Sequence, residues 1–389
     1  MTIRKAANRL LALLLTVTFF AVLTGCESKP LTPPLGTNVK VGIVLVGDES
    51  DSGYNYNHIV GLRKACDELI IPDSNIVIMR NVPENEDSEA AMRQLADEGC
   101  DIIFATSFGY EPYMLKVAQD YPGIQFCHCS GSASAESSLE NVHNYFPKIF
   151  EARYLSGIAA GMKANEIKNY KLGYVGAFDL PEVISGFTAF YLGAKSVAPE
   201  VTMRVIYIMD WNNPELEAEI ARKLIADGAG ILGQHSDSNA IALVAEAEGI
   251  FQVGYNADMV TDAPKASLIS ARLRWSSYYR YALNAVKSGV PFSKDWSEGF
   301  SGNAVYLSQL NEAIAANGTA DAIAEAEKRL NSGYHVFSGP LYGISANGDI
   351  LDIKDGEFFD ECSTRSSPSF DFILSGITVE NAGGVNDEF

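Results

Sequence analysis

The sequence predicts an α/β fold built from two doubly wound, Rossmann-like lobes joined by a hinge. Short apolar runs rich in β-branched residues alternate with segments whose apolar residues recur at helical spacing, a pattern typical of a parallel sheet covered by helices. The alternation occurs in two successive series. A chain of 389 residues is also longer than the range in which one hydrophobic core usually keeps growing, so two lobes are expected.

The first series begins with residues 40–46 (KVGIVLV), a nearly continuous apolar run of the kind that forms a strand buried on both faces of a parallel sheet. Four strands separated by amphipathic helices favour one doubly wound lobe. The other predicted strands are 76–79, 101–105 and 124–127, and the predicted helices are 59–69, 88–98 and 111–121.

The second series has the same rhythm and predicts the other lobe. Its helices are expected at 150–163, 181–197, 214–227 and 240–248, and its strands at 171–175, 203–207, 231–233 and 251–253. Beyond it we predict a strand and a helix within 266–286, another helix at 320–330 and a further crossing at 336–340. Residues 345–352 (SANGDILD) contain an Asn-Gly pair, which is a strong hairpin signal.

This rhythm predicts how the chain is divided between the lobes. The predicted units are a first lobe from 39–147 and 260–338, a second lobe from 148–259 and 339–376, and a tail over 377–389. Several crossings between two such lobes make a hinged clamp, with the ligand at the carboxyl ends of the strands. The loops that follow strands are therefore the candidate site.

The N-terminus has the pattern of a secretion signal. Basic residues at positions 4, 5 and 9 precede an apolar run over 10–23, which is shorter than the roughly 20 residues of a membrane-spanning helix. Leu23-Thr24-Gly25-Cys26 resembles the lipobox of bacterial lipoproteins. We therefore expect a signal peptide over 1–25, lipidation of Cys26, and a tether over 26–38 that holds an extracytoplasmic body at the cell membrane. Ordinary secretion is the alternative.

The charge balance argues against nucleic acid as a partner. The formal net charge is −20, and residues 1–25 hold three basic and no acidic residues, so the chain from Cys26 onward carries −23. A strongly acidic protein offers little attraction to a phosphate backbone. The acidic surface favours a soluble body, which we expect to be a monomer.

Neither a metal nor a cofactor is expected. Besides Cys26 there are five cysteines, and Cys127-His128-Cys129 lacks the two further ligands that a zinc site needs nearby. The glycine-rich nucleotide fingerprints and the Gly-x-Ser-x-Gly elbow are absent, which disfavours an enzyme. His235 and Asp237 lie beside two serines, so hydrolysis or phosphorolysis of a nucleoside stays as an alternative, as does a surface sensor or adhesin on the same clamp.

Three loops after strands of the first series carry candidate ligand-binding residues. Aromatic side chains can stack on a planar ring, and nearby amides, hydroxyls or backbone N–H groups can hydrogen-bond its edge. The candidates, from the loops over 47–57, 106–110 and 130–132, are Tyr54, Asn55, Phe108, Tyr110, Ser130 and Gly131. The alternative for Asn55 is a helix cap with the aromatics packed locally.

The second series offers similar loops. They combine aromatic rings with amide and carboxyl groups, and basic pairs are absent from them, so the ligand should be flat, polar at its edges and largely uncharged. The candidates are Trp211, Gln234, Asp237, Asn256, Asp258 and Trp275. For Trp211 the alternative is a plug on the surface of the lobe. We expect closure to place the ligand ring between Tyr54 or Phe108 and Trp211.

Together these residues resemble the basic membrane protein (Bmp) family of solute-binding lipoproteins, from Val39 to about Leu351. Asp51-Ser52-Gly53-Tyr54-Asn55 is similar to the family's Asp-x-Ser-Phe-Asn loop, and Trp211 corresponds to its second-lobe aromatic. The resemblance implies a type I periplasmic-binding-protein fold, a purine nucleoside or related ligand, and an ABC transporter permease as partner.

Departures from the family pattern concern the sugar. Ser130 stands where nucleoside-binding members have an aspartate, Asn256 replaces the first acid of their Val-Asp-x-Asp motif, and Leu273 replaces a lysine. Residues 234–238 and 275–279 look like a branch of the family associated with purine bases. A free nucleobase is therefore at least as strongly expected as a nucleoside.

Overall fold

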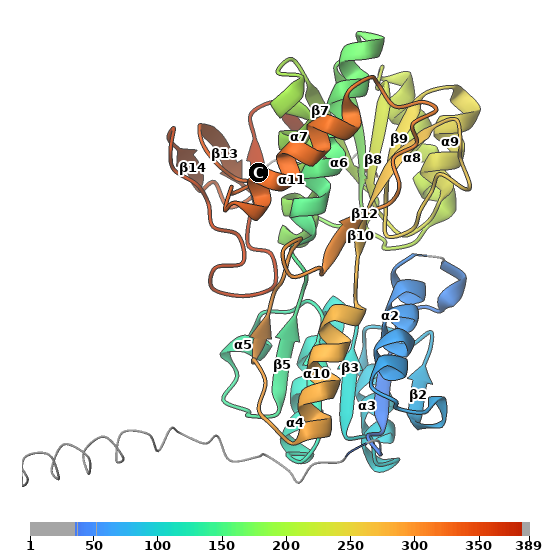
Figure 1. The fold of residues 1–389 in the computed structure, drawn as a ribbon, viewed down its shortest axis with the longest axis vertical. Coiled ribbons are helices and arrows are strands. Elements are labelled where there is room, and N and C mark those ends of the chain that lie inside the picture. The colour runs from blue at the N-terminus through green and yellow to red at the C-terminus, as the bar shows by residue number, and fades with distance from the viewer. Residues whose placement is uncertain (1–35, 37, 52, 383–389) are drawn as a thin grey trace, which may run out of the picture.

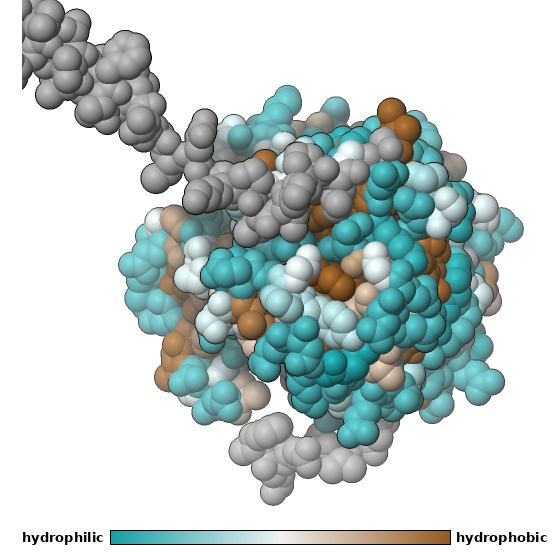
Figure 2. All heavy atoms as spheres, turned by 90° about the horizontal axis from the view of Figure 1, so that it is seen from below, coloured by the Kyte–Doolittle hydropathy of each residue, from teal (hydrophilic) through white to brown (hydrophobic). Residues whose placement is uncertain are grey.

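The computed structural model describes residues 36, 38–51 and 53–382, which form two lobes stacked along the long axis of the molecule (Figure 1). The predicted signal peptide, Cys26 and nearly all of the predicted tether lie outside the described residues. Figure 2, which views the molecule from the end of the first lobe, shows a mainly hydrophilic surface with scattered hydrophobic residues. In the part of the chain that the structure describes, no helix is both long and apolar enough to span a bilayer.

The first lobe is built on a six-stranded parallel sheet with the order β11-β5-β4-β3-β1-β2. Its strands are β1 (Val41–Val44), β2 (Ile76–Met79), β3 (Ile102–Ala105), β4 (Gln125–His128), β5 (Val142–Tyr145) and β11 (Asp295–Trp296). The central strands β1 and β3 are buried along their whole length, because helices cover both faces of the sheet.

Those helices pack in pairs, and each pair forms a core with one face of the sheet. One core joins α2 (Tyr54–Glu68) and α10 (Ser276–Ser288) to residues such as Ile43 and Phe104. The other joins α3 (Glu86–Asp97) and α4 (Glu111–Asp120) to residues such as Val44 and Ile103. Neighbouring residues of one strand therefore enter opposite cores, as the pleat of a strand requires. The short helix α5 (Ala133–Glu136) and three single 3₁₀ turns, η1 (Glu49–Asp51), η2 (Asp73–Asn75) and η3 (Phe108–Tyr110), complete this lobe.

The second lobe has a seven-stranded sheet with the order β12-β10-β9-β8-β6-β7-β16, in which only β12 runs antiparallel to its neighbour. Its strands are β6 (Lys171–Gly176), β7 (Thr202–Tyr207), β8 (Ile231–His235), β9 (Phe251–Tyr255), β10 (Ser267–Leu273), β12 (Val305–Leu307) and β16 (Ile377–Asn381). Its helices are α6 (Ile149–Ile167), α7 (Pro181–Val197), α8 (Pro214–Ala226), α9 (Ala240–Glu248) and α11 (Thr319–Asn331).

Helices α6 and α7 cross with their backbones almost in contact. A Cβ atom at Gly193 would lie 1.9 Å from the carbonyl oxygen of Tyr154, so no larger residue fits there without moving a helix. This close approach draws the two helices into the largest core of the molecule, which also contains the inner face of the second sheet. Helices α8 and α9 cover the opposite face. The lobe is therefore doubly wound, as predicted.

A third, small sheet of antiparallel strands follows α11. It consists of β13 (Leu341–Ser345), β14 (Ile350–Ile353) and β15 (Phe372–Leu374), in the order β14-β13-β15. β13 and β14 pair with Leu341 opposite Ile353, so the hairpin predicted from the Asn-Gly pair is present. Between β14 and β15 the chain makes a long excursion toward the first lobe (Figure 1).

The observed sheets differ from the predicted division of the chain in two places. β10, β12 and α11 were expected in the first lobe, but β10 continues the parallel ladder beside β9, and β12 pairs with β10. Helix α11 packs its buried residues Ile323 and Ala326 into the core of the second lobe. β10 is buried along almost its whole length, and after β9 the nearest place to bury it is the second sheet. The predicted tail contains β16, which pairs with β7 and so covers a sheet edge that would otherwise expose its backbone.

Candidate functional site

A cavity lies between the two lobes, where the loops after the strands of both sheets meet. The first lobe contributes Val46, Tyr54, Ser107, Phe108, Cys129 and Ser130, and the second contributes Glu182, Trp211, His235, Asp237 and Tyr255. Together with its mouth, the cavity has about 430 Å³ of space between atoms, but the centre of a water molecule can occupy only about 30 Å³ of it. We call this narrow space the ring pocket.

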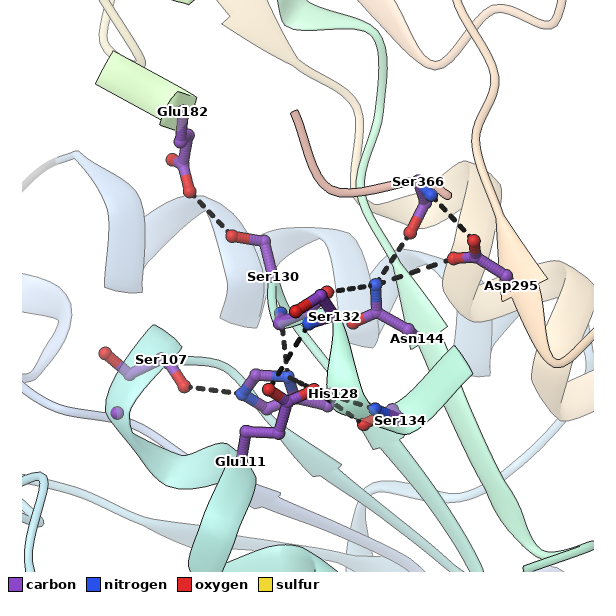
Figure 3. Close-up of polar contacts among 12 residues, drawn as sticks. Ser107, Glu111, His128, Ser130, Ser132, Ser134, Asn144, Glu182, Asp295 and Ser366 are labelled. Atoms are coloured by element: carbon purple, nitrogen blue, oxygen red, sulfur yellow. Dashed lines mark hydrogen bonds and ion pairs between the residues drawn. The ribbon is translucent and has the colours of Figure 1, made fainter. Parts of the chain in front are cut away.

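Hydrogen bonds join the lobes on two sides of the ring pocket. On one side, the hydroxyl of Ser130 donates to the carboxylate of Glu182 at 2.6 Å (Figure 3). On the other, the side-chain amide of Asn57 donates to the backbone oxygen of Asn256 at 3.1 Å. Near this second contact the lobes are so close that a Cβ atom at Gly53 would lie 2.8 Å from a backbone oxygen of the opposite lobe. The lobes are thus in direct contact around the pocket.

Aromatic rings from both lobes line the ring pocket. The hydroxyl of Tyr54 donates to the backbone oxygen of Thr106 at 2.8 Å, which fixes the ring at the start of α2. Phe108 is 46% exposed and sits in a loop that is held by hydrogen bonds from its two neighbours to Glu84, at 2.6 and 2.7 Å. From the second lobe, the partly buried ring of Trp211 leans on Phe178, with 4.8 Å between ring centroids.

Two carboxyl groups of the second lobe are enclosed in the ring pocket. Burial raises the pKa of Glu182, and the hydrogen bond from Ser130 and the charge of Arg153 only partly offset this effect. Burial, helped by the nearby carboxylate of Asp51, raises the pKa of Asp237 well above its ordinary value, although the side chain of Asn256 donates to it at 2.8 Å. Each acid can therefore accept a hydrogen bond when ionised and donate one when protonated.

A buried histidine, His235, and a buried arginine, Arg153, lie close to Glu182. Burial and the charge of Arg153 lower the pKa of His235 well below its ordinary value, so its imidazole is neutral. Neither ring nitrogen of His235 has a hydrogen-bond partner among the described residues, and Nε2 lies 3.6 Å from Glu182. The guanidinium of Arg153 stacks 3.9 Å from the ring of Tyr255 and donates to the backbone oxygen of Gln234 at 2.8 Å. Buried polar atoms are normally paired, so the unpaired imidazole at the wall of the ring pocket is an exception to that rule.

Several predicted site residues line the ring pocket, and others support it from behind. Those lining it are Tyr54, Phe108, Ser130, Trp211 and Asp237. Asn55 bonds to Asp51 and to the backbone of Gly47, so it holds its own loop and does not face the pocket. Gln234 donates to the backbone oxygens of Ser236 and Ser238. Asn256 positions Asp237, and Gly131 lines an adjoining cavity.

Three predicted site residues lie away from the ring pocket. Tyr110 is fully buried in the α3–α4 core and donates to the backbone of Val82. Trp275 is 1% exposed and stacks on His58 in the α2–α10 core, with 4.0 Å between centroids. Asp258 accepts a hydrogen bond from the backbone of Val260, two residues on, and so shapes a turn. Each of these side chains has a structural contact where we expected a ligand contact.

The sequence-based selection missed six residues that line the pocket. They are Val46, Ser107, Cys129, Glu182, His235 and Tyr255. Glu182 is the most instructive, because it stands in the first turn of α7, directly after the loop that follows β6. Like the selected loops, that loop follows a strand of the second sheet. Its position could therefore have marked it as part of the candidate site, although it lacks the clusters of aromatic and amide residues that marked the selected loops.

The described cysteines and acids do not form a metal centre. None of the described cysteines is in a disulfide, and Cys127 and Cys129 are buried in the first lobe. Within the described ranges, there is no group of three His, Cys, Asp or Glu side chains arranged to hold a metal ion.

Residues 38–338 match the family model described as ABC transporter substrate-binding protein PnrA-like, or Bmp. A purine-binding protein of Brucella abortus is 33% identical over 304 residues, which cover 78% of this chain and 84% of that protein. A putative ABC transporter glucose-binding protein of Haloferax volcanii is 31% identical over 310 residues, covering 80% and 77% respectively.

Among solved structures, an ABC transporter solute-binding protein from Conexibacter woesei aligns with a TM-score of 0.60 and 22% identity. The alignment covers 76% of this chain and 98% of that one. With two parallel-sheet lobes and such neighbours, the fold is the type I periplasmic-binding-protein fold that the resemblance implied.

Proposed function

Because the chain belongs to the Bmp, PnrA-like, family of ABC transporter substrate-binding proteins, we propose that it captures a purine base or nucleoside in the ring pocket and delivers it to the permease of an ABC importer. The ligand leaves chemically unchanged. The N-terminal signal and Cys26 would keep the protein outside the cytoplasm, anchored by lipid to the cell membrane, where a permease can be reached.

The observation that carries this proposal is the narrow ring pocket with aromatic side chains on both sides. Tyr54 and Phe108 come from one lobe and Trp211 from the other, and the enclosed space between them is small. A flat heterocycle can enter such a slot and stack on the rings. Because a ligand in the slot touches both lobes, its binding favours the closed arrangement over an open one.

The polar groups of the ring pocket suit the edge of a purine. A purine presents N–H donors and ring-nitrogen or carbonyl acceptors in one plane, and the carboxyls of Glu182 and Asp237 can pair with either kind of group. The neutral imidazole of His235 adds one more donor and one acceptor. A ligand that left one of these buried groups unpaired would lose about 1–3 kcal/mol, which gives the pocket its selectivity.

The names of the two relatives point to different ligands. The purine-binding relative supports a purine, whereas the Haloferax relative is named for glucose. The presence of aromatic side chains from both lobes favours the purine, because a planar aromatic ligand can stack on a ring at each of its two faces.

Calorimetric titration of the purified full chain with adenine, guanine, hypoxanthine, their nucleosides and glucose tests the proposal. We expect at least one purine to bind in the micromolar range or tighter and to be recovered unchanged by chromatography. Binding of glucose with no response to any purine would refute the ligand class. Conversion of the purine into a product would refute the carrier role.

A further inference from the structure

The C-terminal region adds a segment that reaches back to the ring pocket. The family model ends at residue 338, and the chain continues through the small sheet and then through residues 361–370, which we call the strap. The strap is rooted in the second lobe. Glu361 accepts hydrogen bonds from the backbone of Ser369 at 3.0 Å and of Phe370 at 3.1 Å, and the ring of Phe370 stacks on Phe337. Both ends of the strap are therefore held in place.

The tip of the strap is bonded to the first lobe. The backbone N–H of Ser366 donates to Asp295 at 2.7 Å, and the amide of Asn144 donates to the hydroxyl of Ser366 at 2.9 Å (Figure 3). The same amide of Asn144 donates to the backbone oxygen of Gly131 at 2.6 Å. Figure 3 shows this group beside the Ser130–Glu182 contact between the lobes. The strap thus lies against the loop that borders the ring pocket.

A second cavity opens between the strap and that loop. It shares Phe108, Ser130 and Glu182 with the ring pocket, so the two spaces adjoin. The strap contributes Arg365 and Ser367 to its wall. Here the centre of a water molecule can occupy about 160 Å³, against about 30 Å³ in the ring pocket. A ligand that fills only the ring pocket would leave the larger of the two spaces empty.

Two strap residues that line this cavity have polar atoms without a hydrogen-bond partner among the described residues. Ser367 is 5% exposed, and its hydroxyl has no hydrogen-bond partner among the described residues. Nε of Arg365 is likewise buried and unpaired within the described chain, and Nη2 has only a long contact to the backbone of Pro368 at 3.3 Å. Buried polar groups are normally paired, and an acceptor-bearing partner would satisfy both.

We propose that the second cavity is a subsite for an oxygen-rich substituent carried by the ring ligand, with Arg365 and Ser367 of the strap as its donors. This inference rests on the proposed function, since the ring pocket must hold the flat ring. The substituent can be a neutral sugar or an anionic group. A bare base would use only part of the site.

Calorimetry with a matched series tests the subsite: hypoxanthine, inosine and inosine 5′-monophosphate, each titrated into the purified full chain. We expect inosine or its monophosphate to bind at least tenfold more tightly than hypoxanthine. Arg365→Ala should reduce that ratio at least fivefold, and Ser367→Ala should reduce it in the same direction. Ser363→Ala, an exposed position of the same strap, is the control and should leave the ratio unchanged.

The outcomes separate the two proposals. A preference for inosine monophosphate identifies an anionic substituent, and a preference for inosine identifies a neutral sugar. If hypoxanthine binds at least as tightly as both, or if the ratio is the same in Arg365→Ala and Ser367→Ala as in the unchanged chain, the subsite is refuted while the ring pocket stands. If none of the three compounds binds, the inference falls together with the purine assignment. Thermal unfolding of each variant shows that the fold is intact.

Discussion

Removing the ring of Trp211 should weaken ligand binding while leaving the fold intact. The side chain contacts Phe178 and lines the ring pocket. A backbone hydrogen bond holds its loop: the N–H of Asp237 donates to the carbonyl oxygen of Trp211 at 2.9 Å. Trp211→Ala keeps this backbone bond. The substitution therefore removes the ring on which the ligand would stack and leaves the conformation of the loop unchanged.

The magnitude follows from the area that the ligand would cover. A large aromatic side chain buries roughly 150–250 Å² when fully enclosed, and a ring on one face would shield roughly a third of that, about 60 Å². At about 25 cal/mol per Å² this is ~1.5 kcal/mol. Stacking adds ~0.5–1.5 kcal/mol beyond the area. The sum, about 2–3 kcal/mol, corresponds to a rise in Kd of about 30- to 140-fold.

Calorimetric titration with the ligand that co-purifies with the protein measures this effect. Trp211→Phe keeps a ring and should stay within about fivefold of the unchanged chain, since it loses only part of the shielded area. Tyr342→Ala removes an exposed aromatic side chain of the small sheet, away from the ring pocket, and should have no effect. A change of less than threefold for Trp211→Ala, in a protein that unfolds at the normal temperature, would refute the stacking geometry.

Three further outcomes are expected. Trp275→Ala, in contrast, empties a core site beside His58 and should lower the free energy of unfolding by about 3–5 kcal/mol in thermal or denaturant unfolding, and a loss below 1 kcal/mol would contradict its burial. Because the pKa of Glu182 is raised in the folded state, the folded chain holds this proton to higher pH than the unfolded chain, so the ligand-free protein should lose stability relative to Glu182→Gln as the pH rises above the ordinary value of 4.5. Parallel unfolding curves of the two proteins from pH 4 to 8 would contradict that shift. Cys26→Ser should abolish incorporation of radiolabelled fatty acid and release the protein from the membrane fraction, and unchanged labelling would rule out this cysteine as the anchor.

Much of the fold could be predicted because the relevant signals are local. The run over 40–46 is apolar on both faces of a strand, and only a parallel sheet covered by helices buries both. The Asn-Gly pair likewise marks its hairpin within a few residues. Which sheet β10 and β16 join is not determined by a local signal. A strand was predicted where β10 lies, whereas β16 falls in the predicted tail, and the sheet that accepts each of them depends on which strand lies unpaired nearby.

The candidate site was predicted in part for a related reason. Position after a strand correctly pointed to the loops of Tyr54, Phe108 and Trp211, which meet at one cavity. Neighbouring positions in or near such a loop point in different directions, so a shift of one residue decides whether an aromatic side chain faces the cavity or the core. The amino-acid composition of the loop does not reveal that direction. Trp275 therefore looked like a ligand contact and is a core residue.

By itself the sequence determined the two-lobed α/β architecture and pointed to the loops that meet at the ring pocket, because periodicity and spacing are properties of short segments. Only the tertiary structure decided which side chains share a cavity. Glu182 and Ser130 are 52 positions apart and lie in different lobes, yet they meet at 2.6 Å. The strap, far along the chain, lines a cavity with both of them. Such contacts arise when separate lobes pack against each other, and no local pattern encodes that distance.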